Sequence, residues 1–355
     1  MRNKKILMVT PSLTGGGSER VMAILASELA QVHDVTLCLV REKKDSYKVD
    51  ESVKVVRFRS AVKSAPLKML SRALFLRKEM KKCDCVISFM YDINFLTLVS
   101  GIGLKKSIIV SERGNPAVEN RRGLWVRLGR KLLYPMADHV VFQTEQAQSF
   151  FPGHIRKKSA IIPNPLDTAS LPERFEGDRT GNIIAAGRLC EQKNFPMLLK
   201  GFAAFHADHP EYRLVIYGEG HLRSALENLA GELGIGSCVD MPGFTDNLQR
   251  KMADAAMYVS TSNYEGISNS MLEALGMGVP AIVTDCPVGG ARMFVRTDDN
   301  GILIPMEDVE ALTKAMNCIA DNPEYAERIS RNAVAIREEL DAKAISRRWL
   351  ELVEE

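Results

Sequence analysis

Short β-branched runs alternate with segments of helical periodicity along the whole chain, and this alternation most narrows the folds open to it. In the first half the predicted strands are 4–10, 34–40, 53–58, 85–89, 107–111 and 138–142, and the predicted helices are 18–31, 66–82, 94–103, 120–136 and 144–150. In the second half the predicted strands are 182–188, 212–218, 257–261 and 280–284. Such alternation is typical of an α/β fold with mostly parallel sheets covered on both faces.

A break in this pattern predicts two domains. The stretch "SAIIPNPLDT" (159–168) carries two prolines between a strand-like run and the restart of the alternation. A chain of 355 residues also exceeds the usual size of a single core. We therefore expect two Rossmann-like, doubly wound domains, 1–165 and 166–341, with a cleft between them. A last helix, 342–355, is expected to return to the first domain.

The sequence favours a cytoplasmic location. "MRNKKILMVT" runs directly into a strand-like segment, so no signal peptide is expected. The most apolar window, 86–104, contains Asp92 and Asn94 and is a poor candidate for a membrane span. The seven cysteines are scattered and lack CxxC pairs, which indicates neither a disulfide framework nor a zinc site.

The net charge of +3 conceals a strong asymmetry: residues 1–165 carry a balance of +15 and the remainder −12. A basic first half suggests an anionic partner. On a helical wheel the cations Lys68, Arg72, Lys78 and Lys82 share one side of the segment 65–82, and an apolar stripe lies beside them: Met69, Ala73, Leu76 and Met80. A second basic helix, 120–135, surrounds Trp125.

These helices predict docking on an anionic membrane surface, at the cytoplasmic leaflet. The alternative is that the apolar stripe packs on the sheet and the cations are solvated. Nucleic acid is not expected as a partner, because the chain shows no recognition motif and few aromatic residues.

Three loops at the carboxyl ends of predicted strands carry the candidate chemistry. "TGGGSER" (14–20) brings Gly15, Gly16 and Gly17 before a helix, where backbone amides attract a phosphate; a tight turn capped by Ser18 is an equal alternative. "AAGRLCEQKN" (185–194) places Arg188 and Lys193 where two cations suit a leaving diphosphate, although solvated surface cations would look the same.

The third loop, "NYEGISNSMLEALGMG" (263–278), carries two carboxylates. A helix beginning near 268–270 places Glu265 in the loop and Glu273 about one turn into the helix. The helix N-terminus attracts an anion, so each glutamate is expected to meet hydroxyl groups, of a sugar for Glu265 and of a ribose for Glu273. Alternatively, residues 270–273 match a capping box, which accounts for Glu273 alone.

Together these loops resemble the retaining GT-B glycosyltransferases of family 4, over essentially the whole chain. Shorter stretches that share the resemblance are "ADHVVFQTE", "IIPNPLD", "YGEGHLR" and "TDCPVGGARMFV". "VSERGNP" (110–116) looks more narrowly like bacterial members that extend glycans linked to undecaprenyl diphosphate. The resemblance implies transfer of a hexose or N-acetylhexosamine from a UDP-sugar to a lipid-diphosphate-linked glycan acceptor.

The resemblance also implies residue roles. Glu265, Arg188 and Lys193 would be catalytic, with the two cations neutralising the departing diphosphate. The implied donor-binding set is Gly15, Gly16, Gly17, Gly187, Phe244, Gly266, Ile267, Ser268, Asn269, Leu272 and Glu273. The loop 241–244 would border the base. The basic segment 65–82, rather than the resemblance, supplies the expected membrane contacts Lys68, Arg72, Lys78 and Lys82, and Arg113 joins them as an expected acceptor contact.

One position departs from the family pattern. Arg113 stands where many relatives carry a histidine, and a guanidinium cannot serve as a general base at neutral pH. It would contact phosphate or acceptor, or pair with Glu112. No Asp-x-Asp manganese signature is found, so we expect neither metal nor cofactor. Two other functions fit the same architecture: a UDP-N-acetylhexosamine 2-epimerase, and a non-catalytic sugar-nucleotide-binding partner of a larger assembly.

Overall fold

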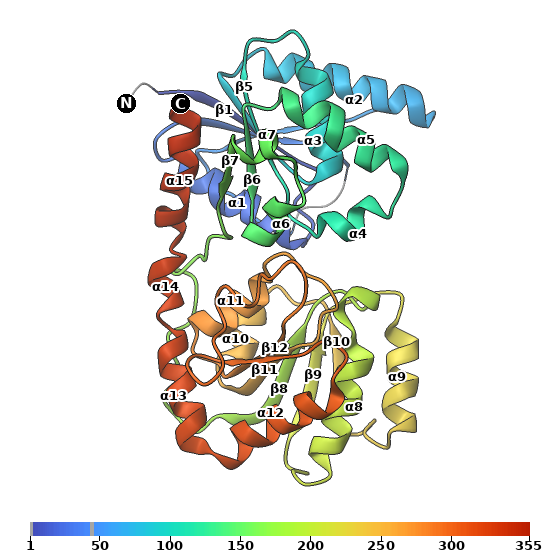
Figure 1. The fold of residues 1–355 in the computed structure, drawn as a ribbon, viewed down its shortest axis with the longest axis vertical. Coiled ribbons are helices and arrows are strands. Elements are labelled where there is room, and N and C mark those ends of the chain that lie inside the picture. The colour runs from blue at the N-terminus through green and yellow to red at the C-terminus, as the bar shows by residue number, and fades with distance from the viewer. Residues whose placement is uncertain (1–2, 43–45) are drawn as a thin grey trace. The chain divides into compact units, whose positions relative to one another are not determined.

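The computed structural model describes residues 3–42 and 46–355 (Figure 1). The chain forms two compact units. The first comprises Met1–Pro165 together with Leu340–Glu355, and the second comprises Leu166–Glu339. The predicted fold class is confirmed: each unit is built on a parallel sheet of the Rossmann type.

The first unit contains a seven-stranded parallel sheet in the order β3-β2-β1-β4-β5-β6-β7. Its strands are β1 (Lys5–Thr10), β2 (Asp34–Leu39), β3 (Lys54–Arg57), β4 (Cys85–Phe89), β5 (Ser107–Ser111), β6 (His139–Phe142) and β7 (Ser159–Ile161). The direction of strand progression reverses between β1 and β4. At such a reversal the loops leave the carboxyl ends of neighbouring strands in opposite directions, which opens a crevice for ligands.

Helices cover this first sheet (Figure 1). They are α1 (Gly17–Leu29), α2 (Ala65–Met80), α3 (Tyr91–Gly101), α4 (Pro116–Asn120), α5 (Leu124–Leu133), α6 (Glu145–Ser149), α7 (Gly153–Arg156) and α15 (Ala342–Glu354). The C-terminal helix α15 packs against α1 and buries Trp349 completely, with its ring 5.5 Å from that of Phe89. The end of the chain is therefore part of the first unit.

The second unit repeats the arrangement with six parallel strands in the order β10-β9-β8-β11-β12-β13. Its strands are β8 (Thr180–Ala186), β9 (Arg213–Tyr217), β10 (Val239–Gly243), β11 (Ala255–Ser260), β12 (Ala281–Thr284) and β13 (Ile302–Ile304). Its helices are α8 (Phe195–His206), α9 (Arg223–Glu232), α10 (Leu248–Met252), α11 (Asn269–Gly276), α12 (Val309–Asp321), α13 (Pro323–Ala333) and α14 (Ile336–Glu339). Here the progression reverses between β8 and β11.

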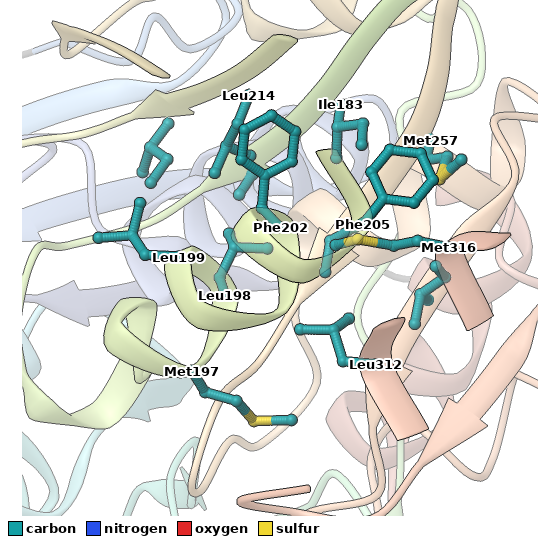
Figure 2. Packing of buried hydrophobic residues seen from close by; sticks show 14 of the residues in the cluster. Ile183, Met197, Leu198, Leu199, Phe202, Phe205, Leu214, Met257, Leu312 and Met316 are labelled. Atoms are coloured by element: carbon teal, nitrogen blue, oxygen red, sulfur yellow. The ribbon is translucent and has the colours of Figure 1, made fainter. Parts of the chain in front are cut away.

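The core of the second unit forms where α8 meets the sheet and α12 (Figure 2). Phe202 and Phe205 are fully buried on α8. They belong to one cluster with Ile183 of β8, Leu214 of β9 and Leu312 of α12. Burying a large apolar side chain stabilises the fold by roughly 1.5–3 kcal/mol, so this cluster gives the strands of the site a rigid base.

The sequence analysis did not predict three of the strands: β7, β10 and β13. All three lie at a sheet edge and span three to five residues. An edge strand pairs on one side alone, so it tolerates residues that a central strand excludes. β10, for example, contains Pro242 and Gly243. The predicted helix 120–136 was also wrong in extent, because Gly123 (φ 150°) separates α4 from α5.

The predicted faces of the segment 65–82 need correction. Leu76 and Met80 are buried, as the alternative to membrane docking requires, whereas Met69 of the same stripe is exposed. Arg72 does not share a solvated face with Lys78: it is half-buried, with its guanidinium carbon 5.4 Å from the centroid of the Phe58 ring. Lys82 lies beyond the end of the helix and pairs with Glu79.

Within residues 3–42 and 46–355, no helix combines the length and the apolar character needed to cross a bilayer.

Candidate active site

The reversal point of the second sheet gathers the candidate catalytic groups. β8 and β11 are neighbours, and the segments that follow them leave their carboxyl ends side by side. The segment after β8 carries Gly187, Arg188 and Lys193, and the segment after β11 carries Glu265. Two stretches separated by about 70 residues in sequence thus meet at one place, as parallel strand topology requires.

Lys193 and Glu265 form an ion pair there, with Nζ 2.7 Å from Oε2. Their side chains are 15% and 23% exposed. Burial disfavours the charged amine, but attraction and hydrogen bonding by Glu265 outweigh it, so the pKa of Lys193 is raised. Lys193 is therefore a permanent cation at neutral pH.

Further contacts fix the Glu265 carboxylate. Its Oε2 accepts from the Ser262 hydroxyl at 3.3 Å, and its Oε1 accepts from Nε2 of Gln192 at 3.4 Å. Gln192 Nε2 also donates to the backbone oxygen of Tyr264 at 3.1 Å, and its own backbone oxygen accepts from the Asn263 amide. Gln192 thereby joins the two loops. The sequence analysis missed it, since a single glutamine in a loop carries no motif.

A third segment supports the Glu265 loop from behind. The Glu265 amide donates to the Pro287 oxygen at 3.0 Å, and the Val288 amide donates to the Glu265 oxygen at 3.2 Å. A Cβ atom at position 290 would lie 1.8 Å from the Gly266 oxygen, so the residue there has to be glycine. The stretch "TDCPVGG" therefore positions the backbone that carries Glu265.

Arg188 lies in the same segment as Lys193, directly after Gly187. It is exposed, and no hydrogen bond or ion pair of its side chain is found within the described part of the chain. The preceding Gly187 has φ 154°, and a Cβ atom there would lie 2.6 Å from Cε of Lys193. Glycine suits this position because other residues rarely adopt its φ, and because the Lys193 side chain passes close to it.

Helix α11 begins where the sequence predicts, at Asn269, but its cap differs. The Ser268 hydroxyl accepts from the Met271 amide, while the Ser270 hydroxyl contacts the Tyr258 hydroxyl at 2.7 Å. The alternative capping box at 270–273 is thus wrong. Glu273 lies one turn into the helix and is 2% exposed. Ile267, Leu272 and Gly266 around it are buried.

The expected base-bordering loop at 241–244 is largely a strand. Residues 241–243 end β10, the edge strand, and only Phe244 follows it. The Phe244 ring is 58% exposed. A flat, exposed aromatic ring at a carboxyl strand end suits stacking against a planar ligand.

In the first unit, the glycine loop is organised by an acidic side chain. Gly15 has φ 102°, and Gly16, rather than Ser18, is the N-cap of α1. The buried Glu19 carboxylate accepts from the Gly16 amide at 3.1 Å, from the Thr14 amide at 2.8 Å and from the Ser12 hydroxyl. The phosphate contact expected of Gly15, Gly16 and Gly17 stays a prediction, and the Gly16 amide is already engaged.

Arg113 does not pair with Glu112, so that alternative is wrong. Glu112 instead accepts two hydrogen bonds from Arg130, at 2.9 and 2.7 Å, and one from the Tyr134 hydroxyl. Arg130 also contacts Glu119, and burial together with Glu112 raises the pKa of Glu119 to about 7. Arg113 is left without a carboxylate partner in the described chain.

No group of three or more His, Cys, Asp or Glu side chains suited to a metal ion occurs among residues 3–42 and 46–355. The site's charged groups are two cations and one loop carboxylate. This set suits stabilisation of a phosphate leaving group next to a developing positive charge.

Comparisons with known proteins identify the family of the chain. The family model described as Glycosyltransferase Family 4 matches residues 15–170, and the one described as Glycosyl transferases group 1 matches residues 172–335. The chain is 28% identical over 361 residues to a Campylobacter jejuni protein named GalNAc-alpha-(1->4)-GalNAc-alpha-(1->3)-diNAcBac-PP-undecaprenol alpha-1,4-N-acetyl-D-galactosaminyltransferase. That match covers 99% of this chain and 98% of the relative.

A second Campylobacter jejuni relative, N-acetylgalactosamine-N,N'-diacetylbacillosaminyl-diphospho-undecaprenol 4-alpha-N-acetylgalactosaminyltransferase, is 26% identical, with 95% of each chain covered. Among solved structures, Anabaena HepE in complex with UDP and glucose superimposes with a TM-score of 0.85 at 16% identity, covering 99% of this chain and 100% of that one. Sucrose-phosphate synthase from Thermosynechococcus elongatus superimposes with a TM-score of 0.84 at 16% identity, covering 99% of this chain and 98% of that one.

The fold and the family matches define a glycosyltransferase of the GT-B type. Within that class, the chain belongs to glycosyltransferase family 4.

Proposed function

We propose that this glycosyltransferase transfers a hexose or N-acetylhexosamine from a UDP-sugar to a glycan linked to undecaprenyl diphosphate, with retention of anomeric configuration. The observation that carries the proposal is the Lys193–Glu265 ion pair at the β8/β11 reversal; Arg188 lies in the same segment as Lys193. The Campylobacter jejuni relatives are named for undecaprenol-linked acceptors, and HepE was solved with UDP. Both support the choice of substrates.

In this proposal the two cations stabilise the departing diphosphate. Arg188 offers a planar fork of N–H donors and Lys193 a point charge, and both suit phosphate oxygens. Glu265 binds the donor sugar and stabilises the positive charge that develops at its ring as the bond to the phosphate breaks. Glu273 holds the ribose hydroxyls, and Phe244 stacks on the base.

We also propose that the reaction needs no metal ion. In metal-dependent transferases a divalent cation neutralises the diphosphate; here Arg188 and Lys193 supply two positive charges to the same group. Turnover is therefore expected to survive EDTA.

The first unit is proposed to dock on the cytoplasmic leaflet of an anionic membrane. Apolar side chains on α2 and α5 are 45–66% exposed: Leu67, Met69, Leu70, Leu74, Leu124, Trp125, Leu128 and Leu132. Both helices pack against α3 (Figure 1). The exposed cations Lys78, Arg127 and Lys131 lie on the same two helices. Apolar groups mixed with cations are typical of surfaces that bind lipid headgroups and the upper acyl region.

The test is UDP release from a panel of UDP-sugars in the presence of EDTA, with and without undecaprenyl-diphosphate-linked sugar in mixed micelles. Release that requires the lipid acceptor supports the proposal and identifies the donor. Glu265→Ala and Lys193→Ala should each abolish it with unchanged circular dichroism, while Lys200→Ala, an exposed cation on α8, should be active. Wild-type kcat/KM in the first two variants would show that Glu265 and Lys193 do not form the active site.

A further inference from the structure

The guanidinium of Arg113 is buried without an anionic partner. The residue is 8% exposed, and its Nη2 donates to Oδ1 of Asn164. Its Nε and Nη1 have no hydrogen-bond partner in the described structure. The remaining contact is with an aromatic face: the guanidinium carbon lies 4.5 Å from the centroid of the Phe89 ring.

Such an environment is costly for a cation unless something else compensates it. Burial lowers the pKa of Arg113 to about 9, so the side chain is still charged at neutral pH. An arginine that only supports the fold ordinarily has its N–H groups bonded to carboxylates or carbonyls, as Arg130 has in the same unit.

A second buried side chain with an unpaired polar atom shares the Asn164 contact with Arg113. Gln143 is 3% exposed, and its Nε2 donates to Oδ1 of Asn164 at 2.6 Å. Because Nε2 is engaged in this way, the orientation of the amide is defined, and its Oε1 is the atom left without a partner. The cluster therefore contains two donor nitrogens on Arg113 and one acceptor oxygen on Gln143 that are buried and lack a hydrogen-bond partner.

The topology places this cluster where ligands bind. Phe89 ends β4, Arg113 follows β5, Gln143 follows β6 and Asn164 follows β7, and these four strands are consecutive neighbours in the sheet. All four residues thus lie at its carboxyl edge, where open α/β sheets bind their ligands.

We infer that Arg113 and Gln143 form a binding site for a sugar phosphate, with a phosphate oxyanion on Nε and Nη1 of Arg113 and a sugar hydroxyl donating to Oε1 of Gln143. This inference rests on the proposed function, whose donor and acceptor both contain a sugar linked to a diphosphate. It gives Arg113 a ligand-binding role in place of the proton transfer that a histidine offers.

The first experiment needs no turnover. Thermal unfolding of the full chain is compared with and without glucose 1-phosphate for wild type, Arg113→Met and the control Arg156→Met, which removes an exposed cation on α7. Without ligand, Arg113→Met should raise Tm by about 2 °C or more, because an uncompensated buried charge is removed. Its ligand-induced rise in Tm should be lost, and that of the control retained. A lower ligand-free Tm, or an unchanged ligand-induced rise, would overturn the inference.

Steady-state kinetics then distinguish the two sources of the phosphate. Arg113→Met should raise KM about 10- to 100-fold for one substrate, with kcat changed much less. A rise for the UDP-sugar assigns the donor diphosphate, and a rise for the lipid-linked glycan assigns the acceptor diphosphate. Arg113→Lys should rescue partly, since an ammonium offers charge without the fork. Unchanged KM for both substrates contradicts the inference. Absence of any transfer by wild type would contradict the proposed function instead, while the glucose 1-phosphate result would stand.

Discussion

Lys193 and Glu265 form an ion pair in which Nζ lies 2.7 Å from Oε2, so each neutralises the charge of the other. A diphosphate that binds Lys193 therefore has to compete with the Glu265 carboxylate for the same ammonium group. This competition makes the two residues separable by experiment, although they form one pair.

Glu265→Gln should bind UDP about 3- to 10-fold more tightly than wild type, because the competing charge is gone while Lys193 remains. The same variant should lose about 10²- to 10³-fold in kcat, the usual effect of removing an electrostatic group from the transition state. Lys193→Met should lose both affinity and turnover. Isothermal titration with UDP and initial rates measure the two effects. Weaker UDP binding by Glu265→Gln would show that the carboxylate does not compete for Lys193.

The close approach of Gly290 to the Gly266 oxygen gives a prediction away from the charged groups. Gly290→Ala should lower kcat/KM at least 100-fold, since the new methyl group has to displace the backbone that carries Glu265. The matched control is Gly231→Ala in α9, where a Cβ atom meets nothing within 4 Å. That change should leave kcat/KM unchanged and stabilise the fold by about 0.5–1 kcal/mol in urea unfolding. Equal activity of the two variants would contradict the proposed support of the loop.

The sequence predicted the position of the loop that carries Glu265 because that position follows from local rules. A glycine and a proline end the helix after 276, and the residues near 268 begin it, so Glu265 had to lie in the loop and Glu273 within the first turns. The capping box at 270–273, the alternative explanation of Glu273, was wrong. Which of two nearby serines accepts the backbone amide depends on the turn that precedes the helix, and Tyr258, 12 residues before Ser270, engages the other hydroxyl.

Sequence patterns did not predict the contacts between segments that are distant in the chain. Gln143 and Asn164 are single amides in unrelated stretches, and only the strand order brings them to Arg113. The apolar periodicity of 65–82 was real, but periodicity does not show how much of a helix its neighbours cover. Met69 continues the stripe of Leu76 and Met80 and is nevertheless exposed.

The buried carboxylates around Arg130 should make stability depend on pH. Burial and Glu112 raise the pKa of Glu119 from 4.5 to about 7, so between these values the folded state binds more protons than the unfolded state. Its contribution to stability is thus complete below pH 4.5 and is lost as the pH rises through 7. Glu119→Gln should therefore gain stability relative to wild type as the pH rises from 5 to 8. Urea unfolding from pH 5 to 8 measures the difference in free energy of unfolding between the variant and wild type. If that difference does not change with pH, the raised pKa of Glu119 is contradicted.

Removing Arg130 from the same network should strongly destabilise the fold. Arg130→Met leaves the buried Glu112 and the partly buried Glu119 without their cation and should cost about 3–5 kcal/mol in urea unfolding. Arg127→Met, one turn earlier on α5 and exposed, should change stability by less than about 0.5 kcal/mol. Comparable losses in the two variants would show that the Glu112 and Glu119 contacts do not stabilise the fold.

Membrane docking can be separated into its apolar and charged contributions, because α5 carries both on its exposed side. Trp125→Ser with Leu132→Ser should reduce binding to vesicles about 10-fold or more at every salt concentration, since burial of apolar area is insensitive to salt. Arg127→Glu with Lys131→Glu should reduce binding to anionic vesicles alone, with an effect that fades as salt screens the charges. Met306→Ser with Phe175→Ser, two exposed apolar residues of the second unit, serves as the control. Sedimentation with neutral and anionic liposomes at low and high salt distinguishes the contributions. If both α5 variants sediment like wild type, this face is not the membrane-docking surface.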